Sequence, residues 1–332
     1  MAFFVPAVRL GAGHLRANVS NGLQYLENQE YILYTTFSVG LGCTFLCLNC
    51  VLLYTLRSKP VFRETSRYIL LYNLLFADTA HLALSLLLYI LAVSRLMLTM
   101  SVCGLLTMFS IYVESISPLT LAVMSVERYV AVCFPLRHAD LVTIRKTGAA
   151  IAAVWTVCSL NIVIRVLILV WRPDYELNEK MKDFCSKEAM FLTPMTKHFD
   201  EAYSSFVFLF GGLAIVFSYV GVTLVARSAS SDKASVRKAG KTVLLHFFQL
   251  VLILTFTLNS IILTAFARQL DRKTLVRLSI IIFVCLNLFP RCLSALIYGL
   301  RDQTLRPALL NNIGCQLRCL VGPNKTKFRK RT

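Results

Sequence analysis

Seven long apolar stretches constrain what this chain can fold into. The hydrocarbon core of a bilayer is about 30 Å thick, so a helix that crosses it needs roughly 20 mostly apolar residues. Each stretch meets this length, and each is bounded by charged or proline-containing connectors. We therefore expect an all-α membrane protein, a bundle of seven transmembrane helices. In chain order, segments one to seven cover 31–56, 68–94, 100–127, 147–170, 204–226, 242–267 and 276–298.

Composition excludes the main soluble alternatives. The chain is 57% hydrophobic and 16% charged, whereas soluble domains average roughly 45–50% apolar and about 25% charged residues. Disordered chains combine high net charge with low hydrophobicity, but here a net charge of +18 accompanies a mean hydropathy of +0.66. In a soluble protein this basicity would suggest a nucleic acid partner. In a membrane protein we expect no nucleic acid and a partnership with lipid.

The distribution of Lys and Arg predicts the orientation. If the N-terminus is outside, the cytoplasmic connectors and tail hold 21 of the 35 basic residues, and the outer parts hold 12. The positive-inside rule therefore places the N-terminus outside, although the short basic loop after segment six opposes it. We expect an extracellular tail over 1–30 and the bundle over 31–300. Residues 301–332 would form a cytoplasmic part with a short amphipathic helix and a basic end attracted to anionic lipid.

Several side chains lie where modification can occur. Most of the 11 cysteines fall inside segments or on the cytoplasmic side. Cys103 begins segment three and Cys185 lies in the long second outer connector, so a disulfide could join them; two unrelated thiols are the alternative. Asn18 opens a glycosylation sequon on the outer side. Cys315 and Cys319 follow the last segment beside basic residues, a setting that suits palmitoylation.

Charged side chains inside the segments need partners, because a charge at the centre of a span costs about 2.5–3.5 kcal/mol on insertion scales. Asp78 lies midway along segment two, and Arg291 lies in the inner half of segment seven. We expect these two to form an ion pair. Ser117 and Ser294 would belong to the same polar network, and Glu114 would lie above it, where a ligand could reach. A purely structural network of buried ions is the alternative.

Two further arginines lie near the ends of their segments. Arg165 is close enough to the outer end of segment four for its side chain to extend to the membrane surface, so we assign it no part in mechanism. Arg128 ends segment three between Glu127 and Tyr129. The neighbouring carboxylate can hold its guanidinium at the cytoplasmic mouth, although such a helix-terminal ion pair is also a common structural feature.

Taken together, these features resemble a class A, or rhodopsin-like, G-protein-coupled receptor over about residues 30–310. The residues that carry this resemblance are Asn49, Leu74 to Asp78, Cys103 placed 25 residues before Arg128, Trp155 and Tyr298. Within the class, further stretches resemble odorant receptors, and the last of them resembles the fish type. These stretches are Met124 to Cys133, Pro135 to His138, Arg237 to His246, and Pro290 to Arg301.

The chain departs from this class at two motifs. Glu127 stands where the class has aspartate before Arg-Tyr, a change that preserves the charge. Ser294-Ala295 stands where the class has Asn-Pro, so we expect segment seven to bend less for lack of that proline. Segment seven also contains no lysine, which disfavours a retinal-bound opsin.

The resemblance implies a mechanism at the plasma membrane of an olfactory sensory neuron. A small, water-soluble odorant would bind between the outer halves of segments three, five, six and seven. The inner end of segment six would then move outward to admit a heterotrimeric G protein. The residues matched to coupling and activation are Glu127, Arg128, Tyr129, Tyr219 and Tyr298. From depth and helix face, the residues expected to line the ligand pocket are Ser110, Ile111, Glu114, Ser115, Phe206, Phe210, Phe256, Asn259 and Asn287.

Three alternatives are weighed against an odorant receptor. The first is a class A receptor for a small ligand outside olfaction. The second is a channel or secondary transporter, which would also carry intramembrane charges, but transporters usually have paired halves with broken helices and no such symmetry is visible. The third is an enzyme, disfavoured because His81 and His246 are isolated in different segments and no nucleophile–base spacing or metal-ligand cluster is present. We expect no cofactor and no metal.

Overall fold

The structure is a computed structural model that describes most of a helical bundle. The described residues are 28–94, 96–171, 185, 187, 194–228, 240–241, 243–245, 247–248, 251–252, 255, 272–292 and 304–312. Most of segment six lies outside them. So do the predicted residues Asn18, Phe256, Asn259, Ser294, Tyr298, Cys315 and Cys319.

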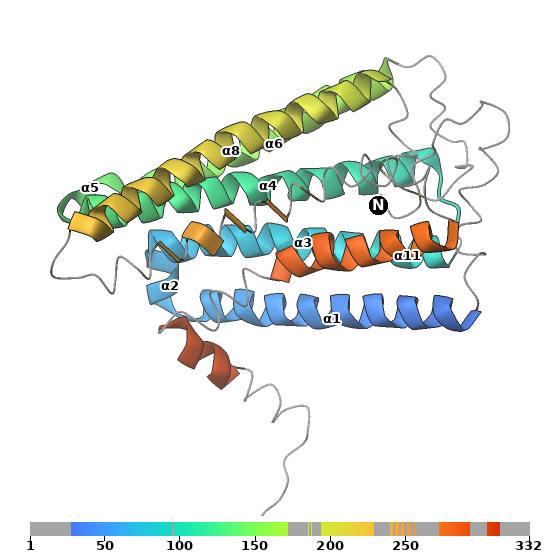
Figure 1. Cartoon of the computed structure of the whole chain (residues 1–332), viewed down its shortest axis with the longest axis horizontal. Helices are drawn as coiled ribbons and strands as arrows, with labels where there is room; N and C mark the ends of the chain where they lie inside the picture. Colours follow the sequence, from blue (N-terminus) through green and yellow to red (C-terminus); the bar gives the residue numbers. More distant parts are fainter. Residues whose placement is uncertain are drawn as a thin grey trace, which may run out of the picture.

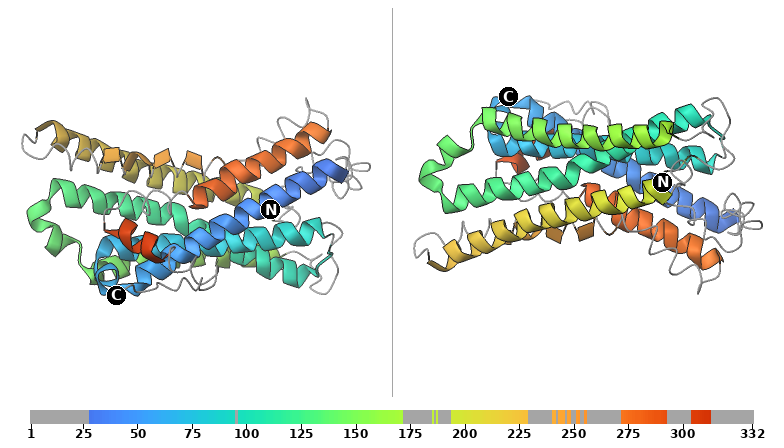
Figure 2. Two further views of the ribbon diagram at one scale, coloured as in Figure 1. Left: turned by 90° about the horizontal axis from the view of Figure 1, so that it is seen from below. Right: turned by 90° about the horizontal axis from the view of Figure 1, so that it is seen from above.

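Five long helices make up most of the described bundle. They are α1 (Asn28–Ser58), α3 (Ser66–Val93), α4 (Met100–Cys133), α6 (Ile144–Val170) and α8 (Pro194–Ser228). Each contains a stretch that is long and apolar enough to cross a membrane. They lie lengthwise beside one another, and α4 contacts α3, α6 and α8 (Figures 1 and 2). Segments one to five are therefore confirmed as helices.

Helices α4 and α8 extend beyond the apolar stretches that predicted them. Helix α4 continues past residue 127 to Cys133 and so includes Arg128. Helix α8 begins at Pro194, whereas the predicted segment began at 204. The prediction missed the first turns because they carry charged residues such as Asp200 and Glu201, which a search for apolar residues passes over. Both extensions bring charged side chains onto regular helix, where their directions are fixed.

Segment seven begins with α11 (Arg272–Ile282), continues as a π-helical stretch, η3 (Phe283–Leu288), and is helical to residue 292. The N–H of Phe289 donates to the carbonyl of Val284, five residues back. Pro290 has no N–H to donate and its ring crowds the preceding turn, which accounts for the wider turn. The expectation that segment seven bends less rested on the missing Asn-Pro motif alone, did not consider this proline, and stays a prediction.

Short helices lie at the end of the bundle where α1 ends and α6 begins. These are α2 (Pro60–Glu64), η2 (Pro135–Arg137) and α5 (His138–Leu141). Residues 305–312 form the short helix expected after segment seven. Its Leu305 is buried in a cluster with Leu52 of α1 and Leu71 of α3, and Asn312 Nδ2 donates to Thr55 Oγ1 over 2.9 Å. These contacts seat the short helix against α1 and α3.

A buried asparagine, Asn73, joins three helices of the bundle. Asn73 of α3 donates through Nδ2 to Thr120 Oγ1 of α4 over 3.1 Å. Its Oδ1 accepts from Trp155 Nε1 of α6 over 2.8 Å. Both polar ends of the amide are thus satisfied, which is what burial of a polar group requires.

Gly221 of α8 allows a close approach to Tyr129 of α4. A Cβ atom at position 221 would overlap the Tyr129 ring, whereas a Cβ at Gly212 of the same helix would meet nothing within 4 Å. The two glycines therefore provide a matched pair, one in contact and one in open space.

We predict that Gly221→Ala lowers the thermal unfolding midpoint of the detergent-purified protein. Forcing a methyl group into a packed contact costs about 1–3 kcal/mol, which exceeds the roughly 1 kcal/mol that alanine gains over glycine in a helix. Gly212→Ala is the control and should leave the midpoint unchanged or raise it. Equal midpoints for the two variants would contradict the packing described here.

Candidate functional site

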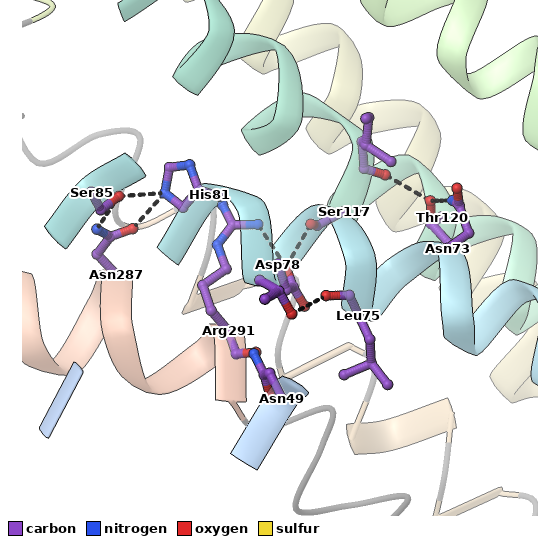
Figure 3. A network of polar contacts seen from close by, with 12 residues as sticks. Asn49, Asn73, Leu75, Asp78, His81, Ser85, Ser117, Thr120, Asn287 and Arg291 are labelled. Carbon is purple, nitrogen blue, oxygen red and sulfur yellow. Dashed lines mark hydrogen bonds and ion pairs between the residues drawn. The ribbon is translucent and has the colours of Figure 1, made fainter. Parts of the chain in front are cut away.

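The centre of the bundle holds a buried ion pair. Arg291 Nη1 of segment seven lies 3.0 Å from Asp78 Oδ1 of α3, and the two side chains are 2% and 0% exposed. Ser117 of α4 donates to the same carboxylate oxygen over 2.6 Å. Asn49 of α1 donates to the backbone carbonyl of Arg291 over 3.3 Å (Figure 3). The ion pair expected from the sequence is present, and it joins four segments.

His81 is a member of this region that sequence reasoning missed. Its Nε2 lies 2.9 Å from Asn287 Oδ1 and 3.2 Å from Ser85 Oγ (Figure 3). Its Nδ1 lies 3.4 Å from the carbonyl oxygen of Ser110. In the tautomer with a proton on Nε2, the imidazole donates to Asn287. His81 follows Asp78 by three residues on one helix, and this spacing puts both on one face; that signal was available in the sequence.

Glu114 of α4 differs from the other carboxylates of the bundle. It is only partly buried, and among the described residues no side chain lies within hydrogen-bond or ion-pair distance of it. The described groups whose charges act on it are His81, Arg291 and Lys187. Arg291 is already paired with Asp78, so Glu114 can accept a hydrogen bond from a donor outside the bundle.

The other predicted pocket residues differ in how deeply they are buried. Ile111 and Ser115 are buried towards neighbouring helices: Ile111 packs in a cluster with Cys103 and Leu169, and Ser115 Oγ accepts from Asn161 Nδ2 of α6 over 3.3 Å. Ser110 is partly buried. By contrast, Phe206 and Phe210 of α8 are 45% and 57% exposed, and their rings pack on each other with centroids 4.6 Å apart. The structure does not bring these two rings together with Glu114.

The expectation for Arg165 is wrong. Instead of extending to the membrane surface, its side chain is 2% exposed and forms an ion pair with Asp200 of α8. Its Nε donates to Asn161 Oδ1 over 3.1 Å, and its guanidinium carbon lies 5.2 Å from the centre of the Phe199 ring. The early start of α8 explains the error, because the first turns of that helix supply both Asp200 and Phe199.

A disulfide joins the second outer connector to α4. Cys103 and Cys185 are bonded, as the sequence predicted, across a separation of 82 residues. Two residues beyond Cys185, Lys187 Nζ lies 3.3 Å from Asp200 Oδ2. The disulfide thus fixes where a cationic side chain of the connector meets α8.

The inner end of α4 carries a second polar site. Arg128 Nε lies 3.1 Å from Glu127 Oε2, and His138 Nε2 lies 3.8 Å from Glu127 Oε1. The Tyr129 ring packs edge-on to Phe134, with centroids 5.9 Å apart. Tyr219 of α8 is 39% exposed. A carboxylate therefore holds the Arg128 guanidinium at the end of the helix.

Comparisons with known proteins show which family the chain resembles. Residues 48–298 match the family described as 7 transmembrane receptor (rhodopsin family). The chain is 29% identical to Odorant receptor 131-2 of Danio rerio over 266 residues, which cover 80% of this chain and 81% of that protein. It is 24% identical to Olfactory receptor 10D3 of Homo sapiens over 87% of this chain and 91% of that protein. It is also 24% identical to Olfactory receptor 4M1 of Mus musculus over 91% of this chain and 95% of that protein.

We predict that Arg291→Met destabilises the bundle by about 3–5 kcal/mol, because it leaves the Asp78 carboxylate buried without its cation. Thermal unfolding of the purified protein and the amount at the cell surface should both fall. Arg277→Met is the matched control. It breaks the ion pair of Arg277 with Glu30, whose side chains are 39% and 34% exposed, so its effect should stay below about 1 kcal/mol. Similar losses in the two variants would contradict the central role of the buried pair.

Proposed function

Because the chain belongs to the rhodopsin family of seven-transmembrane receptors, we propose that it is an odorant receptor. It binds a small water-soluble ligand in the outer half of the bundle and activates a heterotrimeric G protein at the inner end. The relatives named odorant and olfactory receptors support the sensory assignment. The family match favours a receptor over a transporter, a channel or an enzyme. As a seven-transmembrane receptor, the chain is a multi-pass protein of the plasma membrane.

The orientation follows from the chemistry of the two ends. The Cys103–Cys185 disulfide lies where α4 begins, and disulfides persist in an oxidising compartment, which supports an extracellular location for that end. The basic connectors and tail then face the cytoplasm and attract anionic inner-leaflet lipid. Residues 1–30 form the outer tail, with Asn18 available for glycosylation, 31–300 form the bundle, and 301–332 form the cytoplasmic part.

The observation that carries the proposal is the unpartnered Glu114 carboxylate. Buried or half-buried charges are normally paired, and Asp78, Glu127 and Asp200 all have direct cationic partners. A ligand that donates to Glu114 would gain a charge-assisted hydrogen bond in a region of low dielectric constant. Ser110 and Asn287 both contact His81 and supply further polar groups to the proposed pocket. Phe206 and Phe210 are left out of this pocket because they are exposed.

We assign the coupling to the G protein to the polar site at the inner end of α4. In the present structure Glu127 holds Arg128, while Tyr129 packs against Gly221 of α8. Release of Arg128 and a shift of Tyr129 against α8 would open a surface for the G protein. A ligand favours this state only if it binds the open bundle more tightly than the closed one. Tyr219 and Tyr298 are assigned to the same rearrangement.

We predict that Glu127→Gln raises ligand-free signalling, because a neutral amide holds the guanidinium less strongly than a carboxylate does. Signalling is measured as second-messenger production at matched surface expression. Arg128→Ala should abolish signalling in both the parent and the Glu127→Gln background. Arg277→Lys, at the outer end, is the control and should leave basal signalling unchanged. Unaltered basal signalling in Glu127→Gln at normal surface expression would count against the proposed release.

We predict that Glu114→Gln weakens the response to ligands that carry a cationic group by roughly 10-fold to 150-fold, the loss expected for a charge-assisted hydrogen bond of about 1.5–3 kcal/mol. Concentration–response curves for charged and uncharged water-soluble compounds measure this. Uncharged ligands should keep their potency to within a few fold. A uniform loss across both kinds of compound would assign Glu114 a structural role instead.

A further inference from the structure

A polar cluster joins α4, α6 and α8. Its members are Ser115 of α4, Asn161 and Arg165 of α6, and Asp200 of α8, and Lys187 of the outer connector closes it. Ser115, the residue after Glu114, makes the contact with α6 through Asn161. The cluster therefore contacts α4 at the residue that follows Glu114.

Arg165 has a donor group to spare. Its Nε is bonded to Asn161 and its Nη2 to Asp200, but its Nη1 is buried and has no hydrogen-bond partner within the described structure. A buried, unsatisfied donor on a charged group costs more than a neutral one, and buried polar groups in native proteins are normally bonded. An acceptor oxygen brought by a ligand would satisfy this nitrogen.

The charges of the region are unbalanced in a complementary way. Arg165, Lys187 and Asp200 are in mutual contact through Asp200 and carry one net positive charge. Glu114 carries one negative charge and has no direct partner among the described residues. Lys187 contacts Asp200 and also acts electrostatically on Glu114. Lys187 therefore connects a cluster that carries an excess positive charge with a carboxylate that has no direct partner among the described residues.

We propose that the ligand is a small zwitterion whose two charged groups match these two centres. Its ammonium group donates to Glu114, and its carboxylate accepts from Arg165 Nη1 and Lys187. This inference rests on the proposed function and names the class of ligand for it. A simple amine would satisfy Glu114 alone, and a simple acid would satisfy only the Arg165 cluster. A compound with both groups leaves neither charge unpaired.

The disulfide gives this arrangement its geometry. Cys185 is anchored to α4, and Lys187 follows it by two residues. Before ligand binds, Lys187 is held by Asp200 and attracted by Glu114. When the ligand ammonium reaches Glu114, Lys187 is free to turn fully towards the ligand carboxylate and Asp200. The outer connector thus contributes a recognition residue.

The test uses the full-length protein and compounds of matched shape. The probes are the common L-amino acids, their methyl esters, which keep only the cation, and their N-acetyl derivatives, which keep only the anion. Binding is measured as ligand-induced thermal stabilisation of the purified receptor without G protein, and activation as second-messenger production in cells. We expect at least one free amino acid to exceed both of its derivatives by roughly tenfold or more in apparent affinity, since each derivative lacks one charge-assisted hydrogen bond.

Arg165→Lys assigns the effect to the cluster. Lysine keeps the charge beside Asp200 but lacks a second terminal nitrogen, so the variant should lose the preference for the amino acid over its ester while the affinity for the ester stays the same. Lys187→Gln, in the partly exposed connector, should reduce the same preference and serves if Arg165→Lys does not fold. Arg277→Lys makes the same chemical change at the outer end and should leave the preference unchanged.

Each outcome has a definite consequence. A preference for the free amino acid that disappears in Arg165→Lys or Lys187→Gln supports the zwitterion. Esters that bind as well as amino acids, or a preference that survives both variants, would overturn it. Activation by uncharged compounds with no binding of any amino acid would overturn it and leave the receptor function standing. Stabilisation by an amino acid without any G-protein response would instead contradict the proposed function and keep the binding site.

Discussion

The buried ion pair of Asp78 and Arg291 is the interaction on which the rest of the bundle depends. Placing either charge alone at the centre of a span costs about 2.5–3.5 kcal/mol on insertion scales, so each residue requires the other. Ser117 donates to the Asp78 carboxylate, and Asn49 donates to the backbone carbonyl of Arg291. Because the partners come from α1, α3, α4 and segment seven, one ion pair determines how four segments pack. The π-helical turn before Pro290 lies next to it and directs Asn287 to His81.

This centre separates two sites of different chemistry along α4. Glu114 lies on the outer side of the pair and Arg128 at the inner end of the helix, about 21 Å apart at 1.5 Å per residue. The outer site has a carboxylate, Glu114, without a direct partner among the described residues and an excess positive charge where Arg165 and Lys187 share Asp200, which suits recognition. At the inner site Glu127 holds Arg128, which suits a contact that is broken on activation. Helix α4 carries both sites and packs against α3, α6 and α8, and two arrangements of the bundle would suffice to couple the sites.

Hydropathy predicted the five described spans well, because about 20 apolar residues leave few alternatives to a membrane helix. The positions of the charged residues within the segments also predicted the pairing of Asp78 with Arg291, since two opposite charges at similar depth have few other partners. Hydropathy failed where a helix extends into polar sequence. The first turns of α8 were missed, and with them Asp200, so the burial of Arg165 could not be foreseen. Phe206 and Phe210 show a further limit: depth along a helix can be read from the sequence, but the direction a side chain faces depends on how neighbouring helices pack.

The most direct test of the central pair is a double-mutant cycle on thermal stability with Asp78→Asn, Arg291→Gln and the double variant. Residues in direct contact show coupling energies of about 0.5–3 kcal/mol, and burial of this pair places it at the upper end of that range. The account predicts that each single variant is strongly destabilised and that the double variant is clearly more stable than the sum of the two losses allows. Additive losses, with no coupling between the two positions, would contradict it.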